Sequence, residues 1–166
     1  MSKVALTALI AGLATATVID LRTRRIPNDL TAAMVGVGIG LAATGTSGIT
    51  VAASFIGFFL GLALMMPGYA LGATGAGDVK LMGAVGAIVG PGLVVSAFLF
   101  TAIAGGVLAV MVAARRQRLA ATLAQTRQLV AGPGEAPQKI RAAGGASRFA
   151  YGPAIAIGSV IAVLIA

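Results

Sequence analysis

The sequence of 166 residues contains no cysteine, no histidine and no tryptophan, and it has only four acidic residues. Without cysteine or histidine the chain cannot form disulfides, a thiol nucleophile, a serine–histidine triad, or the usual zinc, haem and copper sites. Any catalysis must therefore use carboxylates, hydroxyls, lysine or the backbone. The four acids are Asp20, Asp29, Asp78 and Glu135.

Charged residues of both signs are scarce: they make up 10% of the chain, whereas hydrophobic residues make up 58%. A soluble domain needs charged side chains at roughly a quarter to a third of its surface positions. We therefore expect an integral membrane protein, with its 24 glycines serving close helix packing in lipid.

The sequence contains long runs without a charged residue. At roughly 20 residues per spanning helix, these runs accommodate about six spans. We predict an all-α fold, a six-transmembrane-helix bundle that forms one domain over residues 1–166. The predicted spans lie near 3–19, 30–45, 49–66, 78–90, 93–114 and 149–166.

The basic residues indicate an orientation. Six spans place residues 20–29, 67–80 and 115–148 on one face of the membrane and both termini on the other. Eleven of the twelve basic residues fall in these three segments, and only Lys3 lies opposite. By the positive-inside rule this face is cytoplasmic, so the net charge of +8 indicates orientation and not nucleic-acid binding. The segment 115–148 is expected to be a basic cytoplasmic loop near anionic lipid.

Two of the acids are predicted to converge on that face. Asp20 ends the first predicted span and Asp78 begins the fourth, and the two intervening spans return the chain to the same side. Acids at a membrane boundary are costly and usually functional. Asp29 is the competing candidate, although a role as a first-turn acid of the second span is sufficient for it.

Two carboxyl groups held close together in a partly desolvated site cannot both ionise easily, so they share a proton. The ionised group can then activate water, while the protonated group polarises a carbonyl or donates to a leaving nitrogen. Gly75 and Gly77, just before Asp78, allow an irregular backbone to which a substrate strand could hydrogen-bond.

Three elements together resemble a known family. They are Asp20 with Ile26-Pro27-Asn28, then Gly75-x-Gly77-Asp78-x-Lys80, and late in the chain Tyr151-Gly152-Pro153. In this order they resemble the type IV prepilin peptidases, which are aspartic membrane peptidases of the GxGD type. The resemblance covers essentially the whole length.

That resemblance implies an endopeptidase of the cytoplasmic (inner) membrane that removes the short basic leader from pilin-like precursors. It implies Asp20 and Asp78 as the catalytic pair, no metal or cofactor, and partners limited to the precursors and membrane lipid. The chain lacks the cysteine-bearing insertion of the bifunctional members, so it resembles the short, peptidase-only form found in Tad/Flp pilus systems. Methyl transfer and zinc are not implied.

Two other classes of protein stay open from the residues alone. Paired acids beside a glycine-rich helix start also suit a small cation- or proton-coupled transporter, which would place them near the bilayer midplane. The chain could also be an inactive pilus-assembly scaffold, in which both aspartates would be dispensable.

Overall fold

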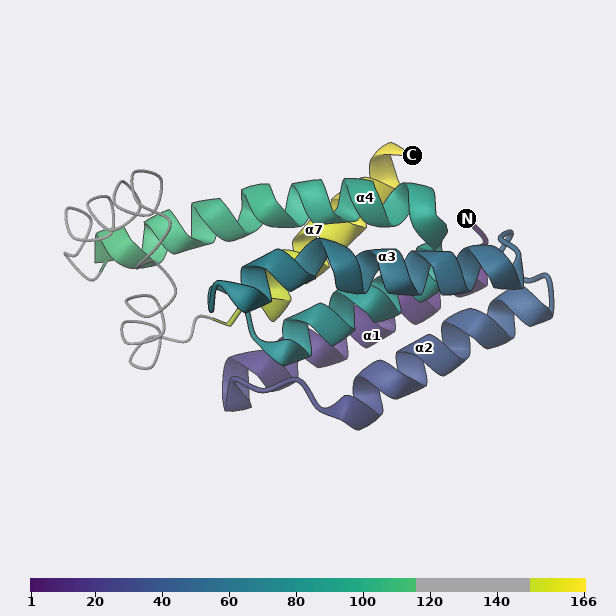
Figure 1. Ribbon diagram of the computed structural model, residues 1–166, viewed down its shortest axis with the longest axis horizontal. Coiled ribbons are helices and arrows are strands. Elements are labelled where there is room, and N and C mark those ends of the chain that lie inside the picture. Colours follow the sequence, from purple (N-terminus) through teal and green to yellow (C-terminus); the bar gives the residue numbers. More distant parts are fainter. Residues whose placement is uncertain (116–149) are drawn as a thin grey trace.

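The computed structural model describes residues 1–115 and 150–166, and within these ranges the chain forms five helices and no strand (Figure 1). The predicted all-α class is confirmed. The helices are α1 (Lys3–Thr23), α2 (Asn28–Ala43), α3 (Val51–Ala70), α4 (Ala76–Arg115) and α7 (Gly152–Ile165).

Local side chains set the ends of several helices. The Ser2 hydroxyl caps α1 by accepting a hydrogen bond from the Ala5 amide at 3.2 Å, and Thr50 caps α3 by accepting from Ala53 at 3.1 Å. Such caps satisfy amides that have no partner within the helix. Arg24 ends α1 in the left-handed conformation, with a φ of 53°. This conformation turns the chain toward α2.

The predicted count of six separate helices is not supported, because the segments predicted as 78–90 and 93–114 are joined in one element, α4. Inside α4 only the turn at Gly90 departs from helical geometry, with a φ of 82° and a ψ of 177°. The chain reverses there, so that the two halves of α4 run in opposite directions (Figure 1). Pro91 follows directly, and its missing N–H suits the first turn of a new helical segment.

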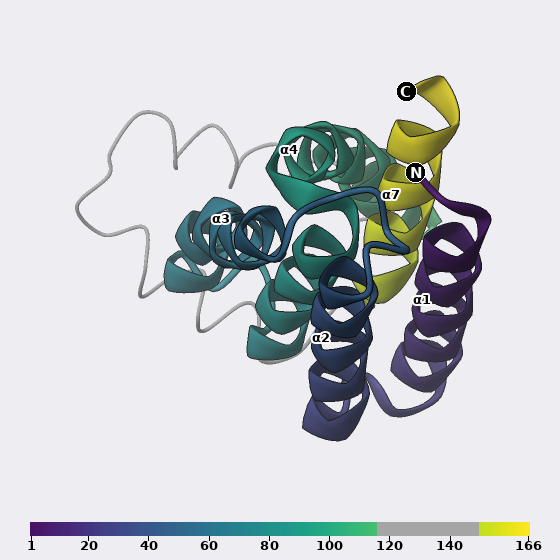
Figure 2. The same ribbon diagram turned by 90° about the vertical axis from the view of Figure 1, so that its right-hand side faces the viewer.

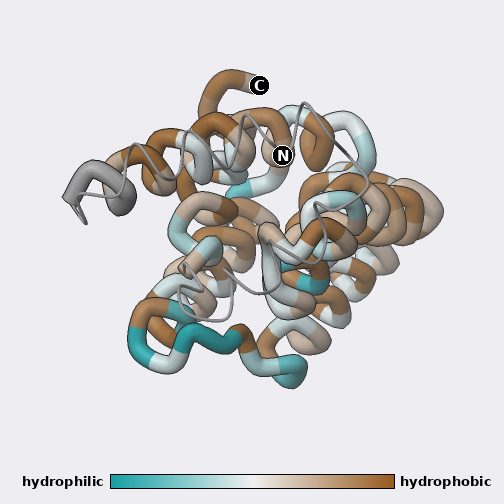
Figure 3. The backbone as a smooth tube through the Cα atoms, turned by 60° about the vertical axis from the view of Figure 1, so that its left-hand side comes forward, coloured by the Kyte–Doolittle hydropathy of each residue, from teal (hydrophilic) through white to brown (hydrophobic). Residues whose placement is uncertain are grey.

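Three of the helical segments are long and apolar enough to cross a membrane, namely Lys3–Thr23, Val51–Ala70 and Ala76–Met111. The remaining two, α2 and α7, are shorter apolar helices. Hydrophilic residues are few along the chain, and the most hydrophilic stretch is the connection between α1 and α2 (Figure 3). These helices and the exposed apolar side chains that cover them are those of a membrane protein.

The first half of α4 is the centre of the bundle, and α2, α3 and α7 are arranged around it (Figure 2). All residues at 81–90 are buried, including Leu81, Met82 and Val85. Glycine allows α3 to approach closely, because a Cβ on Gly57 would lie 2.9 Å from the carbonyl carbon of Gly86. Close backbone contact of this kind is typical of helix packing in membranes.

Several helix ends far apart in the sequence share one end of the bundle. The end of α1, the start of α2, the end of α3 and the starts of α4 and α7 lie there, and both chain termini lie at the other end (Figure 1). We call this the site end of the bundle, since Asp20 and Asp78 are found at it. The predicted loop lies outside the described residues from position 116 onward.

Candidate active site

Asp20 lies in the last turn of α1 and is only 4% exposed. Its Oδ2 accepts a hydrogen bond from the backbone N–H of Gly152, the first residue of α7, at 2.9 Å. The contact joins residues 132 positions apart in the sequence. The free amides at the start of a helix favour an anionic partner, so the start of α7 stabilises and orients this buried carboxyl group.

Asp78 lies in the first turn of α4 and is 8% exposed. Its Oδ2 accepts a hydrogen bond from the Gly75 N–H at 2.8 Å, and the Asp78 N–H donates to the Gly75 carbonyl at 3.1 Å. This exchange is half of a capping box, in which a side chain in the first turn reaches back to the residue before the helix. The local sequence thus fixes the direction of the carboxyl group.

The two carboxyl groups are near enough for their charges to interact. Two glycines permit this proximity. A Cβ on Gly152 would lie 2.8 Å from Oδ2 of Asp20, and a Cβ on Gly77 would lie 3.1 Å from the Cβ of Ile26. Ile26 is buried in the connection that follows α1. Any larger residue at Gly152 or Gly77 would therefore push α7 or the α1–α2 connection away from the site.

Tyr151 directly precedes Gly152, and its hydroxyl group lies near enough to Asp78 to be influenced by the charge of that carboxyl group. The ring packs against Gly105 in the second half of α4, where an added Cβ would lie 2.6 Å from the Tyr151 Cζ. Tyr151 and Gly152 belong to the sequence elements that carry the family resemblance, but no contact was predicted for either of them. The structure assigns Gly152 a direct hydrogen bond to one of them.

The other charged residues considered in the sequence analysis do not join the pair of Asp20 and Asp78. Asp29 is exposed in the first turn of α2, which fits a helix-start acid. Lys80 donates to Oδ1 of Asn28 at 2.8 Å, linking α4 to α2 across 52 positions, a pairing that the sequence did not predict. Glu135 lies outside the described residues.

Gly75 and Gly77 were predicted to bind substrate through their backbone. In the structure the Gly75 N–H is engaged by Asp78, and Gly77 packs against Ile26. Both glycines thus have roles in shaping the site itself, and substrate binding by them stays a prediction. Within residues 1–115 and 150–166, no three His, Cys, Asp or Glu side chains are grouped so as to hold a metal ion.

Comparison with known protein families gives a match over most of the described helices. The model of the type IV leader peptidase family matches residues 7–110, a range that includes Asp20, Asp78 and the glycines before Asp78 but not α7. Neither the search of curated proteins nor the search of solved structures found a match. Because the family model covers more than half of the sequence, this chain belongs to the type IV leader peptidase family.

Proposed function

We propose that the protein is an aspartic endopeptidase that removes the short basic leader from pilin-like precursors at the cytoplasmic face of the membrane. Membership of the family makes it a peptidase. The observation that supports the finer proposal is the pairing of Asp20 and Asp78, two buried carboxyl groups from different helices that interact at one end of the bundle.

In the proposed reaction one aspartate is ionised and takes a proton from a water molecule as the water oxygen attacks the scissile carbonyl carbon. The other is protonated and polarises the carbonyl oxygen. When the carbon–nitrogen bond breaks, the leaving nitrogen receives a proton from the pair, and the free amine and carboxylic acid are released. Each carboxyl group has its Oδ2 held by a backbone amide, which fixes the orientation of the group for the reaction.

The position of the pair favours a peptidase over a transporter. Asp20 is in the last turn of α1 and Asp78 in the first turn of α4. Transporter sites are typically near the bilayer midplane, at breaks within helices. A pair at helix ends can reach a leader peptide that stays in water. Orientation of this end toward the cytoplasm is supported by the basic residues near it, which are Arg22, Arg24, Arg25 and Lys80.

Co-expression with a pilin-like precursor tests the function. We expect the wild type to shorten the precursor to the mass of the mature form. Asp20→Asn and Asp78→Asn should each abolish cleavage, because an amide can neither accept the proton from water nor return it. Asp29→Asn is the matched control and should cleave normally. Cleavage by both the Asp20→Asn and the Asp78→Asn variants would exclude the aspartic mechanism and favour a different peptidase chemistry or a scaffold role.

A further inference from the structure

The Ile26-Pro27-Asn28 element connects α1 to α2 and takes no part in the proposed chemistry. Its position is fixed by the end of α1, because the Arg24 N–H donates to the carbonyl of Asp20 at 2.8 Å. The chain therefore turns back at the residue that carries one carboxyl group of the proposed pair. Ile26 follows shortly after this turn and is only 9% exposed, so the connection is anchored in the protein.

Ile26 packs against Gly77, the residue that directly precedes Asp78. A Cβ built on Gly77 would lie 3.1 Å from the Cβ of Ile26, 3.5 Å from its backbone nitrogen and 3.6 Å from its Cγ1. The contact thus involves both the backbone of the connection and the part of the side chain nearest to it. Because Gly77 lies in the first turn of α4, the contact holds the helix of one aspartate against the end of the other's.

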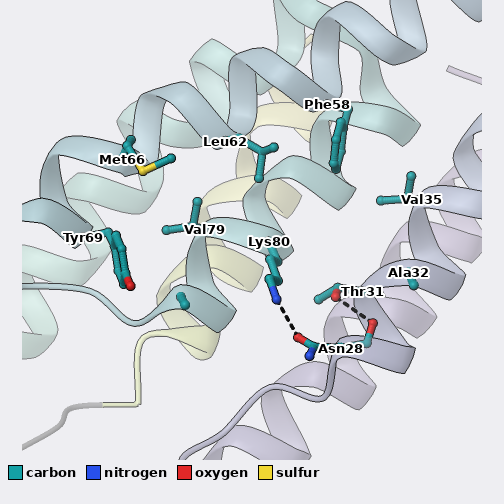
Figure 4. A pocket seen from close by; sticks show the side chains of 11 residues that line it. Asn28, Thr31, Ala32, Val35, Phe58, Leu62, Met66, Tyr69, Val79 and Lys80 are labelled. Carbon is teal, nitrogen blue, oxygen red and sulfur yellow. Dashed lines mark hydrogen bonds between the residues drawn. The ribbon is translucent and has the colours of Figure 1, made fainter.

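Asn28 makes a second contact, with a residue that follows Asp78 in the sequence. Its Oδ1 accepts a hydrogen bond from Nζ of Lys80 at 2.8 Å (Figure 4). Both side chains line the pocket between α2, α3 and the start of α4 (Figure 4). The donor is charged, which strengthens such a bond. The connection therefore holds α4 at two positions, one directly before Asp78 and one shortly after it.

We propose that Ile26 and Asn28 are positioning residues, which hold the start of α4 against the end of α1 and thereby set the separation of the two carboxyl groups. This inference rests on the proposed function, and it goes further by assigning the pair a support in addition to Gly152. A reacting group that is displaced by about 1 Å can lose a hundredfold in rate. A small shift of this connection is therefore enough to reduce catalysis.

Substitution of Ile26 tests its contact with Gly77. Ile26→Ala removes the side chain beyond Cβ, whereas Ile26→Val keeps the three atoms that lie nearest to Gly77. For cleavage of a pilin-like precursor we expect Ile26→Ala to lower kcat by roughly tenfold or more and to leave KM within about twofold, since a displaced carboxyl group impairs the transition state and not substrate binding. Ile26→Val should restore kcat to near the wild-type value.

Leu9→Ala is the matched control for Ile26→Ala. Leu9 is fully buried in the same core, and it lies about 16 Å along α1 from Asp20, at 1.5 Å per residue. Both alanine variants remove the same number of buried carbon atoms and should lose comparable stability in thermal unfolding, but Leu9→Ala should keep kcat within about twofold of the wild type. Equal losses of kcat in the two variants, or no recovery in Ile26→Val, would overturn the proposal.

A double-variant comparison tests the bond between Asn28 and Lys80. We expect Asn28→Ala and Lys80→Met each to lower kcat by roughly three- to tenfold, and the variant that carries both to be no slower than either alone, because residues that share one interaction have non-additive effects. Asp29→Ala, at the neighbouring exposed position, should keep kcat near the wild-type value. Losses that multiply in the double variant would overturn the role of this bond.

The outcomes separate this inference from the proposed function. Failure of the wild type to cleave any pilin-like precursor would count against the function. Wild-type cleavage together with an unchanged kcat in Ile26→Ala would overturn the positioning role and leave the peptidase assignment intact.

Discussion

Gly152 holds the candidate active site together by lacking a side chain. Gly152 donates its N–H to Asp20, and a Cβ at this position would come within 2.8 Å of the oxygen that accepts the bond. Asp20 itself is almost fully buried and cannot move aside without losing its partner. The position of the carboxyl group therefore depends on the residue that begins α7.

Gly152→Ala is predicted to lower kcat by roughly ten- to a hundredfold, because displacement of a reacting group by about 1 Å can cost that much. The measurement is precursor cleavage by the purified variant at saturating substrate. Gly106→Ala is the control, since a Cβ there meets nothing within 4 Å. An unchanged kcat for Gly152→Ala would show that the contact with Asp20 has no part in catalysis.

The residues that meet at the candidate site could be singled out in the sequence, whereas their hydrogen-bond partners could not. Asp20, Asp78 and the glycines before Asp78 stand out in the sequence because acids are so few and because they lie next to apolar runs. The bond from Gly152 to Asp20 and the bond from Lys80 to Asn28 join distant positions. Neither bond has a local sequence signal, since each depends on how the helices pack.

Among the helices, α4 determines the architecture through its reversal. Gly90 has a φ of 82° and a ψ of 177°, a backbone region that is essentially restricted to glycine. The reversal lets one element supply both the buried centre of the bundle and the helix that packs against Tyr151. The sequence predicted a break at this position from its glycines and proline, and the structure has the break at Gly90, within α4.

Gly90→Ala is predicted to reduce the free energy of unfolding by about 1–3 kcal/mol, the cost of forcing a Cβ into that backbone region. Gly92→Ala is a close control, because Gly92 has no positive φ and a Cβ there meets nothing within 4 Å. Chemical or thermal unfolding in detergent compares the two variants. Equal stability would mean that the reversal does not depend on glycine.

The sequence predicts where the helices lie along the chain better than it predicts which neighbours each helix packs against. Uncharged runs of sufficient length identify membrane helices from composition, and the structure has helices in each of the predicted segments that it describes. Composition does not indicate which helix is central, because lipid-facing and buried positions are equally apolar in a membrane protein. The central place of α4 and the pocket between α2 and α3 therefore emerge only from the packing.

For the molecule as a whole, the basic residues predict that the site end faces the cytoplasm. The absence of native cysteine allows a direct test with single substitutions at two exposed positions, Arg25 after α1 and Thr46 between α2 and α3. A membrane-impermeant thiol reagent added to intact spheroplasts should label Thr46→Cys and should label Arg25→Cys only after lysis. The reverse pattern would place the active site outside the cytoplasm.

The central claim is that Asp20 and Asp78 act as one catalytic unit, and a double-mutant comparison tests it most directly. The rate of precursor cleavage is measured for Asp20→Asn, Asp78→Asn and the variant that carries both, with Asp29→Asn as control. Residues that act as a unit have strongly non-additive effects, so each single variant should be as inactive as the double variant while Asp29→Asn stays active. The account would be contradicted if the fold-loss of cleavage rate in the double variant were the product of the two single losses. Near-normal cleavage by either single variant would also contradict it.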